Sequence, residues 1–151
     1  MPQSLVQNYQ HIVFSTKMRQ PFLRDASIRR EMHAYLGGVC RNRRSPSIIV
    51  GGAEDHVHIF CRLSKSIAID DFLAELKRES SKWVKTKAEE CLFFYWQSGY
   101  GAFSVSPSHV EELRRYITQQ EEHHRRETFQ EEYRRLLRKY GLEWDERFIW
   151  D

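Results

Sequence analysis

The chain contains no long apolar run, because none of its hydrophobic stretches approaches the roughly 18 residues that a membrane-spanning helix needs. Its first residues also lack the basic segment followed by an apolar one that marks a secretory signal. Three residues of the 151 are cysteines, an odd number without the paired spacing of zinc sites or disulfide frameworks. These absences predict a cytoplasmic protein in a reducing compartment, with no membrane partner.

Internal repeats, linkers and low-complexity segments are absent too, so a chain of 151 residues suits one domain with a hydrophobic core. We expect this domain to cover residues 1–151, with a core at about 8–126 and a C-terminal extension at about 127–151. The composition is 40% hydrophobic, 13% aromatic and 30% charged, which is typical of a globular protein.

The formal net charge is only +3, but basic residues are concentrated in one part of the chain. Between residues 17 and 44, the only acidic residues are Asp25 and Glu31. A local excess of positive charge favours a polyanionic partner, and an ordinary solvated helix face is the alternative. The basic residues of this segment are Lys17, Arg19, Arg24, Arg29, Arg30, Arg41, Arg43 and Arg44.

The apolar pattern changes its period several times along the chain. Runs rich in β-branched and aromatic residues indicate strands, and apolar residues at helical spacing indicate helices. The predicted elements are a strand over 9–16, a helix capped by Asp25, strands over 47–52 and 56–63, a helix over 68–90, a strand over 100–106 and a long helix capped by Ser108. A charged helical segment follows over 121–139, with an apolar stripe of Phe129, Tyr133, Leu136 and Leu137.

This order of strands and helices matches the split βαβ arrangement of ferredoxin-like (RRM-like) folds. We therefore predict an α+β protein with a four-stranded antiparallel sheet and helices on one face, plus a C-terminal helical extension. The same fold supports many functions, so the function has to be argued from individual residues.

His56-Val57-His58, at the start of the third predicted strand, is the first candidate site. Because successive strand side chains point to opposite faces, both imidazoles project the same way while Val57 turns into the core. Such a pair can hold one divalent metal ion. In a chain with seven histidines, a His-x-His pair can easily arise by chance. The alternative is therefore that the two histidines are ordinary polar residues on a solvated strand face. The neighbouring Asp55 is expected to point to the opposite face and to take no part in catalysis.

Tyr116 and Gln120 supply complementary groups on the helix after the fourth strand. They lie four residues apart and hence on one helix face, so a phenol and an amide oxygen can both point towards the paired histidines. The alternative for Tyr116 is the edge of an amphipathic helix, where most helical tyrosines lie.

Three segments together resemble the single-tyrosine HUH transposases, small enzymes of bacterial insertion sequences that move as single-stranded DNA. The segments are His56-Val57-His58, the run Trp96-Gln97-Ser98-Gly99-Tyr100-Gly101-Ala102-Phe103-Ser104-Val105-Ser106, and Tyr116 followed by Gln120. The resemblance extends over nearly the whole chain, to the closing segment from Tyr140 to Phe148. The run that begins at Trp96 is its most specific part.

The resemblance implies a metal-dependent transposase that cleaves and rejoins single-stranded DNA at hairpin-flanked element ends. Tyr116 would be the nucleophile and would form a 5′-phosphotyrosine intermediate. His56, His58 and Gln120 would bind Mg²⁺ or Mn²⁺, and their mixed nitrogen and oxygen donors suit Mn²⁺ better. The resemblance also implies a homodimer whose active sites are shared between subunits, acting on single-stranded DNA with hairpin ends.

Several basic residues are candidate contacts to DNA phosphates. One alternative function is a domesticated nuclease that processes palindromes with the same chemistry. Another is a non-catalytic nucleic-acid-binding module, although the sequence lacks the RRM submotifs. A hydrolase with a water nucleophile would bring more carboxylates near the histidines. The candidate phosphate contacts are Lys17, Arg19, Arg41, Arg43 and Arg44.

Overall fold

A computed structural model describes residues 2–151 of the protein, which form a four-stranded antiparallel sheet in the order β2-β3-β1-β4. The strands are β1 (Tyr9–Ser15), β2 (Ser47–Gly52), β3 (His56–Arg62) and β4 (Gly101–Ser104). The split βαβ arrangement has two central strands that are not consecutive in sequence. Here these are β1 and β3, with β4 beside β1 and β2 beside β3. The predicted α+β fold is therefore confirmed.

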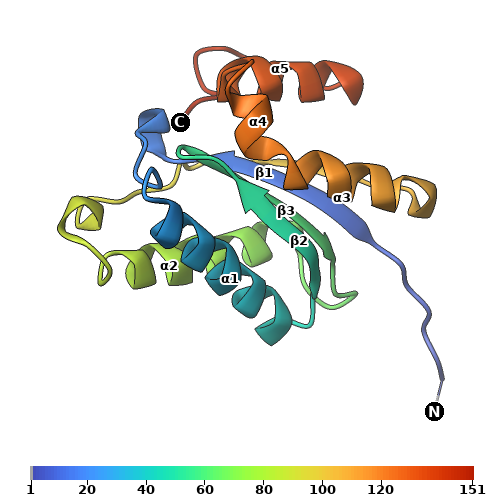
Figure 1. Cartoon of the computed structure of the whole chain (residues 1–151). Helices are drawn as coiled ribbons and strands as arrows, with labels where there is room; N and C mark the ends of the chain where they lie inside the picture. The colour runs from blue at the N-terminus through green and yellow to red at the C-terminus, as the bar shows by residue number, and fades with distance from the viewer. Residues whose placement is uncertain (1) are drawn as a thin grey trace.

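Helices cover both faces of this sheet (Figure 1). On one face lie α1 (Ala26–Asn42) and α2 (Ile69–Val84), as the prediction of helices on one face requires. The opposite face carries the C-terminal helices, which are α3 (Val110–Thr118), α4 (Gln120–His124) and α5 (Phe129–Lys139). Short 3₁₀ turns occur at Lys17–Arg19, Glu89–Cys91 and Pro107–His109. Within residues 2–151, the helices are all too short or too polar to cross a membrane.

Local sequence signals explain where several elements begin. The Asp25 carboxylate accepts hydrogen bonds from the backbone amides of Ser27 and Ile28 at 2.9 and 3.0 Å, so Asp25 caps α1 as predicted. Thr128 and Glu131 form a reciprocal capping box that starts α5, which satisfies amides that the helix itself leaves unpaired.

The predicted helices after β3 are wrong in detail. The helix predicted over 68–90 ends at Val84, and Ser106 rather than Ser108 accepts the capping hydrogen bond before α3. The long helix is also interrupted at Gln119, between α3 and α4. Just before this break, the Thr118 hydroxyl donates to the Arg114 carbonyl at 2.8 Å, a side-chain bond that often bends helices.

The apolar side chains form two clusters, one on each face of the sheet. The larger lies under α1 and α2, where Ile12, Val57, Ile59, Phe72 and Leu76 are fully buried. The smaller lies under α5 and contains the whole predicted stripe of Phe129, Tyr133, Leu136 and Leu137, together with Val13 and Phe103.

Candidate metal and tyrosine site

The histidine pair lies on β3, on the sheet face opposite the larger apolar cluster. Val57 belongs to that cluster, while His56 and His58 turn to the other side and are 0% exposed. Their rings lie 5.2 Å apart between centroids. The expected common direction of the two rings is therefore present, and the alternative of a solvated strand face is wrong.

Tyr116 and Gln120 of the same chain lie over this pair. The Gln120 amide oxygen is 2.8 Å from His56 Nε2, and the Tyr116 ring centroid is 5.9 Å from that of His58. Although the break at Gln119 places the two residues on different helices, both still face the sheet at the histidines. The structure thus brings together all four residues that the sequence suggested.

Glu132 on α5 lies at the centre of the cluster and was not anticipated from the sequence. Its Oε1 is 3.3 Å from both His56 Nε2 and His58 Nε2. Its Oε2 accepts a hydrogen bond from the Gln120 amide nitrogen at 2.8 Å and another from the Tyr116 hydroxyl. One buried carboxylate therefore contacts every predicted member of the site.

The sequence did contain a signal for Glu132. Phe129, Glu132, Tyr133 and Leu136 follow one another at helical spacing, which puts an acidic residue inside the apolar stripe of α5. Since an unpaired carboxylate is rarely buried, this position required a polar or cationic partner elsewhere in the fold.

The other edges of the histidine rings also have polar partners. Asp55 Oδ1 is 2.8 Å from His56 Nδ1, and His11 Nε2 is 2.8 Å from His58 Nδ1. The expectation that Asp55 points to the opposite face is wrong, because β3 begins at His56 and Asp55 lies in the preceding bend, where strand alternation does not hold.

The charges of this cluster follow from burial and contact. Burial lowers the pKa of His56, but its hydrogen bonds to Asp55 and Glu132 outweigh that effect and raise the pKa to about 9. For His58, burial outweighs the attraction of Glu132, so its pKa is lowered. Burial disfavours the charged form of Glu132, yet its contacts to the two histidines hold the pKa of this carboxyl well below its usual range. The cluster therefore pairs an imidazolium with a carboxylate.

The Tyr116 hydroxyl is held between an acceptor and a donor. It donates to Glu132 and accepts from Arg135 Nη2 at 2.8 Å. Burial and the negative charge of Glu132 raise the pKa of Tyr116, against the opposing effect of Arg135. The phenol is therefore protonated at neutral pH, and the group that contacts its proton is Glu132.

The donor atoms of this cluster fit a divalent cation. Ligand atoms of His56, His58 and Glu132 all lie within 4.8 Å of one another, and all three residues are buried. Two imidazole nitrogens with a carboxylate, and the Gln120 amide oxygen beside them, form a mixed set that suits Mn²⁺ or a later transition metal better than Mg²⁺.

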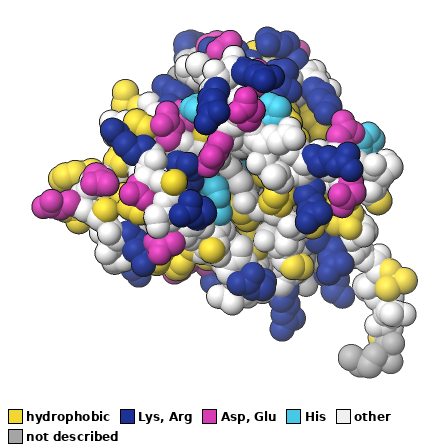
Figure 2. Space-filling model, in the orientation of Figure 1, with side chains coloured by type: hydrophobic (Ala, Val, Ile, Leu, Met, Phe, Trp, Pro, Cys, Tyr) yellow, Lys and Arg dark blue, Asp and Glu magenta, His cyan; other side chains and the backbone are white. Residues whose placement is uncertain are grey.

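The five predicted phosphate contacts do not form one surface. Lys17 and Arg19 precede α1, whereas the other three residues are at its C-terminal end, so the length of this 17-residue helix, about 25 Å, lies between the two groups. Arg43 is also bonded to Glu75 on α2. On the face shown in Figure 2, basic and acidic side chains are intermingled. The group at the C-terminal end of α1 consists of Arg41, Arg43 and Arg44.

Comparison with known proteins adds a family match. The family model described as "Transposase IS200 like" matches residues 4–120, a range that includes His56, His58, Tyr116 and Gln120 but ends before Glu132. No curated protein matches the chain significantly.

Two solved structures share the fold. One is a candidate transposase from Deinococcus radiodurans R1, with a TM-score of 0.58 and 20% identity, which covers 80% of this chain and 97% of that one. The other is a REP-associated tyrosine transposase bound to a REP hairpin, with a TM-score of 0.50 and 12% identity, which covers 78% and 67% of the two chains. At these identities the similarity shows the fold alone.

Proposed function

Because this chain belongs to the IS200-like transposase family, we propose that it cleaves and rejoins single-stranded DNA through a 5′-phosphotyrosine intermediate. Family membership by itself supports a DNA-cleaving transposase. The observation that carries the proposed chemistry is the contact of one buried carboxylate, Glu132, with a tyrosine hydroxyl, an amide and two imidazoles.

Tyr116 is the proposed nucleophile. Its oxygen attacks the scissile phosphorus and forms a new phosphodiester bond, while the bond to the 3′ oxygen breaks and that oxygen takes a proton from water to leave as a 3′-hydroxyl. The phenol proton passes to Glu132, which already accepts its hydrogen bond. Arg135 remains beside the attacking oxygen and can stabilise negative charge there. Because a phosphotyrosine bond replaces the cleaved phosphodiester bond, the 3′-hydroxyl of another strand can attack that bond and reverse the step without ATP.

The metal-binding role is assigned to His56, His58, Glu132 and Gln120. The first three have ligand atoms close enough to share one ion, and the Gln120 amide oxygen lies 2.8 Å from His56 Nε2. We propose Mn²⁺ or Mg²⁺, which when bound polarises the scissile phosphate and offsets charge in the transition state. This ligand set differs from the one expected from the sequence, because it adds the carboxylate of Glu132.

The shared active site of a homodimer stays a prediction. One chain places its own Tyr116 against its own histidines, which supports attack within a single subunit. Mixing Tyr116→Phe protein with His56→Ala protein separates the two arrangements. Adduct formation by the mixture requires shared sites, and its absence supports a site within one chain.

The nucleophile is tested by incubating the protein with Mn²⁺ and labelled single-stranded hairpin DNA, followed by a denaturing gel. Wild type should form a covalent adduct, and Tyr116→Phe should form none. Tyr133→Phe is the matched control, because Tyr133 is a buried tyrosine that belongs to the apolar stripe of α5, and it should keep the adduct. An adduct on Tyr116→Phe would contradict the assignment. Binding without cleavage would favour a binding module, and cleavage without an adduct a water nucleophile.

A further inference from the structure

The two histidine rings are held from behind by different partners. Each turns Nε2 towards Glu132 and Nδ1 away from it. At Nδ1, His56 meets the Asp55 carboxylate and His58 meets the His11 imidazole, each at 2.8 Å. Asp55 and His11 are both buried, so bulk water does not replace either contact.

The position of His11 follows from the register of the sheet. Val13 on β1 is paired with His58 on β3, and His11 lies two residues from Val13, so it is on the same face and diagonal to His58. The two rings are nearly parallel, with centroids 5.0 Å apart. Only strand pairing brings these residues together, since they are 47 positions apart in sequence.

Metal binding sets a requirement on these rear contacts. An imidazole that binds an ion through Nε2 is neutral and carries its remaining proton on Nδ1, and this N–H needs an acceptor. The Asp55 carboxylate can only accept. His11 can accept through Nε2 when its own proton is on Nδ1.

We infer that Asp55 and His11 are positioning residues, which accept the Nδ1 protons of His56 and His58 and so direct both Nε2 atoms towards one ion. The inference rests on the proposed function, because it assumes that these two nitrogens bind metal. It also predicts unequal ligands: the carboxylate behind His56 makes that ring a stronger donor than His58, which has only a neutral ring behind it.

The same geometry allows a different role for Asp55. Ligand atoms of Asp55, His56 and His124 also lie within 4.8 Å of one another, so Asp55 is close enough to bind an ion of its own. That ion would need His56 Nδ1, the nitrogen that hydrogen-bonds to Asp55 at 2.8 Å. The two roles therefore exclude each other and predict different metal stoichiometries, one ion or two.

The role of His11 is tested with two variants of the full chain. His11→Phe keeps an aromatic ring against His58 but removes the acceptor, whereas His11→Gln puts an amide oxygen near the position of Nε2. Mn²⁺ affinity, followed by the electron paramagnetic resonance of free Mn²⁺, should fall roughly 10- to 100-fold in His11→Phe and stay close to wild type in His11→Gln. Thermal unfolding without metal shows whether each variant is folded.

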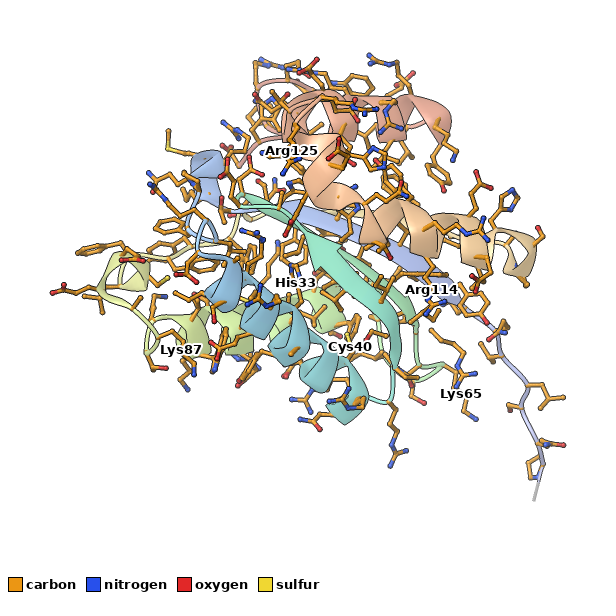
Figure 3. The ribbon with its side chains drawn as sticks, in the orientation of Figure 1. His33, Cys40, Lys65, Lys87, Arg114 and Arg125 are labelled. Atoms are coloured by element: carbon orange, nitrogen blue, oxygen red, sulfur yellow. The ribbon has the colours of Figure 1, made fainter. Side chains whose placement is uncertain are left out.

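His33→Phe is the matched control. His33 projects from α1 on its sheet-facing side (Figure 3) and is partly buried, but it makes no hydrogen bond to the cluster through its Nε2. Its replacement should leave Mn²⁺ affinity unchanged. Asp55→Asn keeps an acceptor oxygen and loses the charge, so its affinity should fall by roughly tenfold, at the lower end of the range for such contacts.

Nitrogen-15 spectra of the Zn²⁺-loaded protein provide a readout that packing alone does not move. Wild type should show an Nδ1–H signal for both His56 and His58, and His11→Phe should lose the hydrogen-bonded signal of His58. If wild type binds no Mn²⁺, the proposed function fails. If wild type binds one ion and folded His11→Phe binds it as tightly, the role of His11 is overturned. Two bound ions, one of which is lost in Asp55→Asn, would overturn the role of Asp55.

Discussion

Both faces of the sheet bury an apolar cluster, but only the face under α3 to α5 also buries the charged and polar cluster around Glu132. On β3, Val57 and Ile59 turn to the apolar cluster under α1 and α2, while His56 and His58 turn to α4 and α5. All four side chains are fully buried. One face excludes water around hydrocarbon, and the other excludes it around charged and polar groups as well as around the smaller apolar cluster.

This difference separates stability from chemistry. Apolar burial is non-directional and contributes about 25 cal/mol per Å² of surface removed from water, so the α1 and α2 face stabilises the fold. Buried charges are favourable only when each has a partner, so the α3 to α5 face depends on the complete set of contacts around Glu132. We expect changes on the first face to alter unfolding alone, and changes on the second to alter the site as well as unfolding.

The largest effect on unfolding should come from Phe72→Ala on the apolar face. Phe72 is fully buried in the larger cluster, and removal of such a side chain leaves a cavity that typically costs 3–5 kcal/mol. Urea denaturation should show this loss. The Mn²⁺ affinity of the remaining folded protein should equal that of wild type, and a weaker affinity would mean that the two faces are coupled.

The next largest effect is a pH dependence of the free energy of unfolding, which arises on the sheet face that carries His56. The pKa of His56 is raised from 6.5 to about 9 in the folded protein, so its stabilisation is complete below pH 6.5 and is lost as pH rises through 9. The expected loss for the metal-free protein is about 3 kcal/mol, measured by urea unfolding across this range. His56→Gln should remove the slope. With Mn²⁺ the trend reverses, because the ion competes with the proton for Nε2.

A smaller effect is expected where α3 meets the sheet. A Cβ on Gly51 would lie 2.7 Å from the Ile117 Cγ2 and 2.8 Å from the Ile117 carbonyl oxygen, so Gly51→Ala must push the tyrosine helix away from β2. We expect a loss of about 1–3 kcal/mol and adduct formation slower by about 10²-fold. Gly38→Ala, in α1, should instead stabilise by about 0.5–1 kcal/mol, since its added Cβ meets only the end of Arg41. Equal adduct rates in the two variants would contradict the close-approach argument.

The smallest effect on stability concerns the exposed arginines at the C-terminal end of α1. Among the ion pairs of residues 2–151, Arg43 is bonded to Glu75, whereas Arg41 takes part in none. Either change to alanine should alter unfolding by less than about 1 kcal/mol. Arg41→Ala should reduce the slope of the logarithm of the DNA-binding constant against the logarithm of the salt concentration by about one unit. Arg43→Ala should reduce this slope less. Identical slopes in wild type and Arg41→Ala would remove Arg41 from the phosphate contacts.

Local patterns predicted those parts of the fold that depend on neighbouring residues. Alternating and β-branched runs located all four strands, and Asp25 located the start of α1. The break at Gln119 was not predicted, because periodicity continues across it. The Thr118 hydroxyl donates to the Arg114 carbonyl just before it, a bond that often bends helices. Ser106 and Ser108 are both good caps, and the intervening Pro107 favours a 3₁₀ turn that starts at the first of them.

The site divides in the same way. His56, His58, Tyr116 and Gln120 are recognisable because strand and helix spacing puts each pair on one face. Glu132 and His11 have no such spacing relative to the histidines, so their contacts depend on how α5 docks and how β1 pairs with β3. Asp55 was misplaced because strand alternation was applied one residue before the strand begins.

The sequence by itself determined the order of the elements, the apolar face of each and the residues able to bind metal or attack phosphorus, since these depend on side-chain type and short-range period. Tertiary structure alone decided that both histidines share one carboxylate and that their rear nitrogens face Asp55 and His11. The physical reason is that a buried polar group takes its ionisation and its hydrogen-bond direction from neighbours, and those neighbours come from β1, α4 and α5, which only the folded chain brings together.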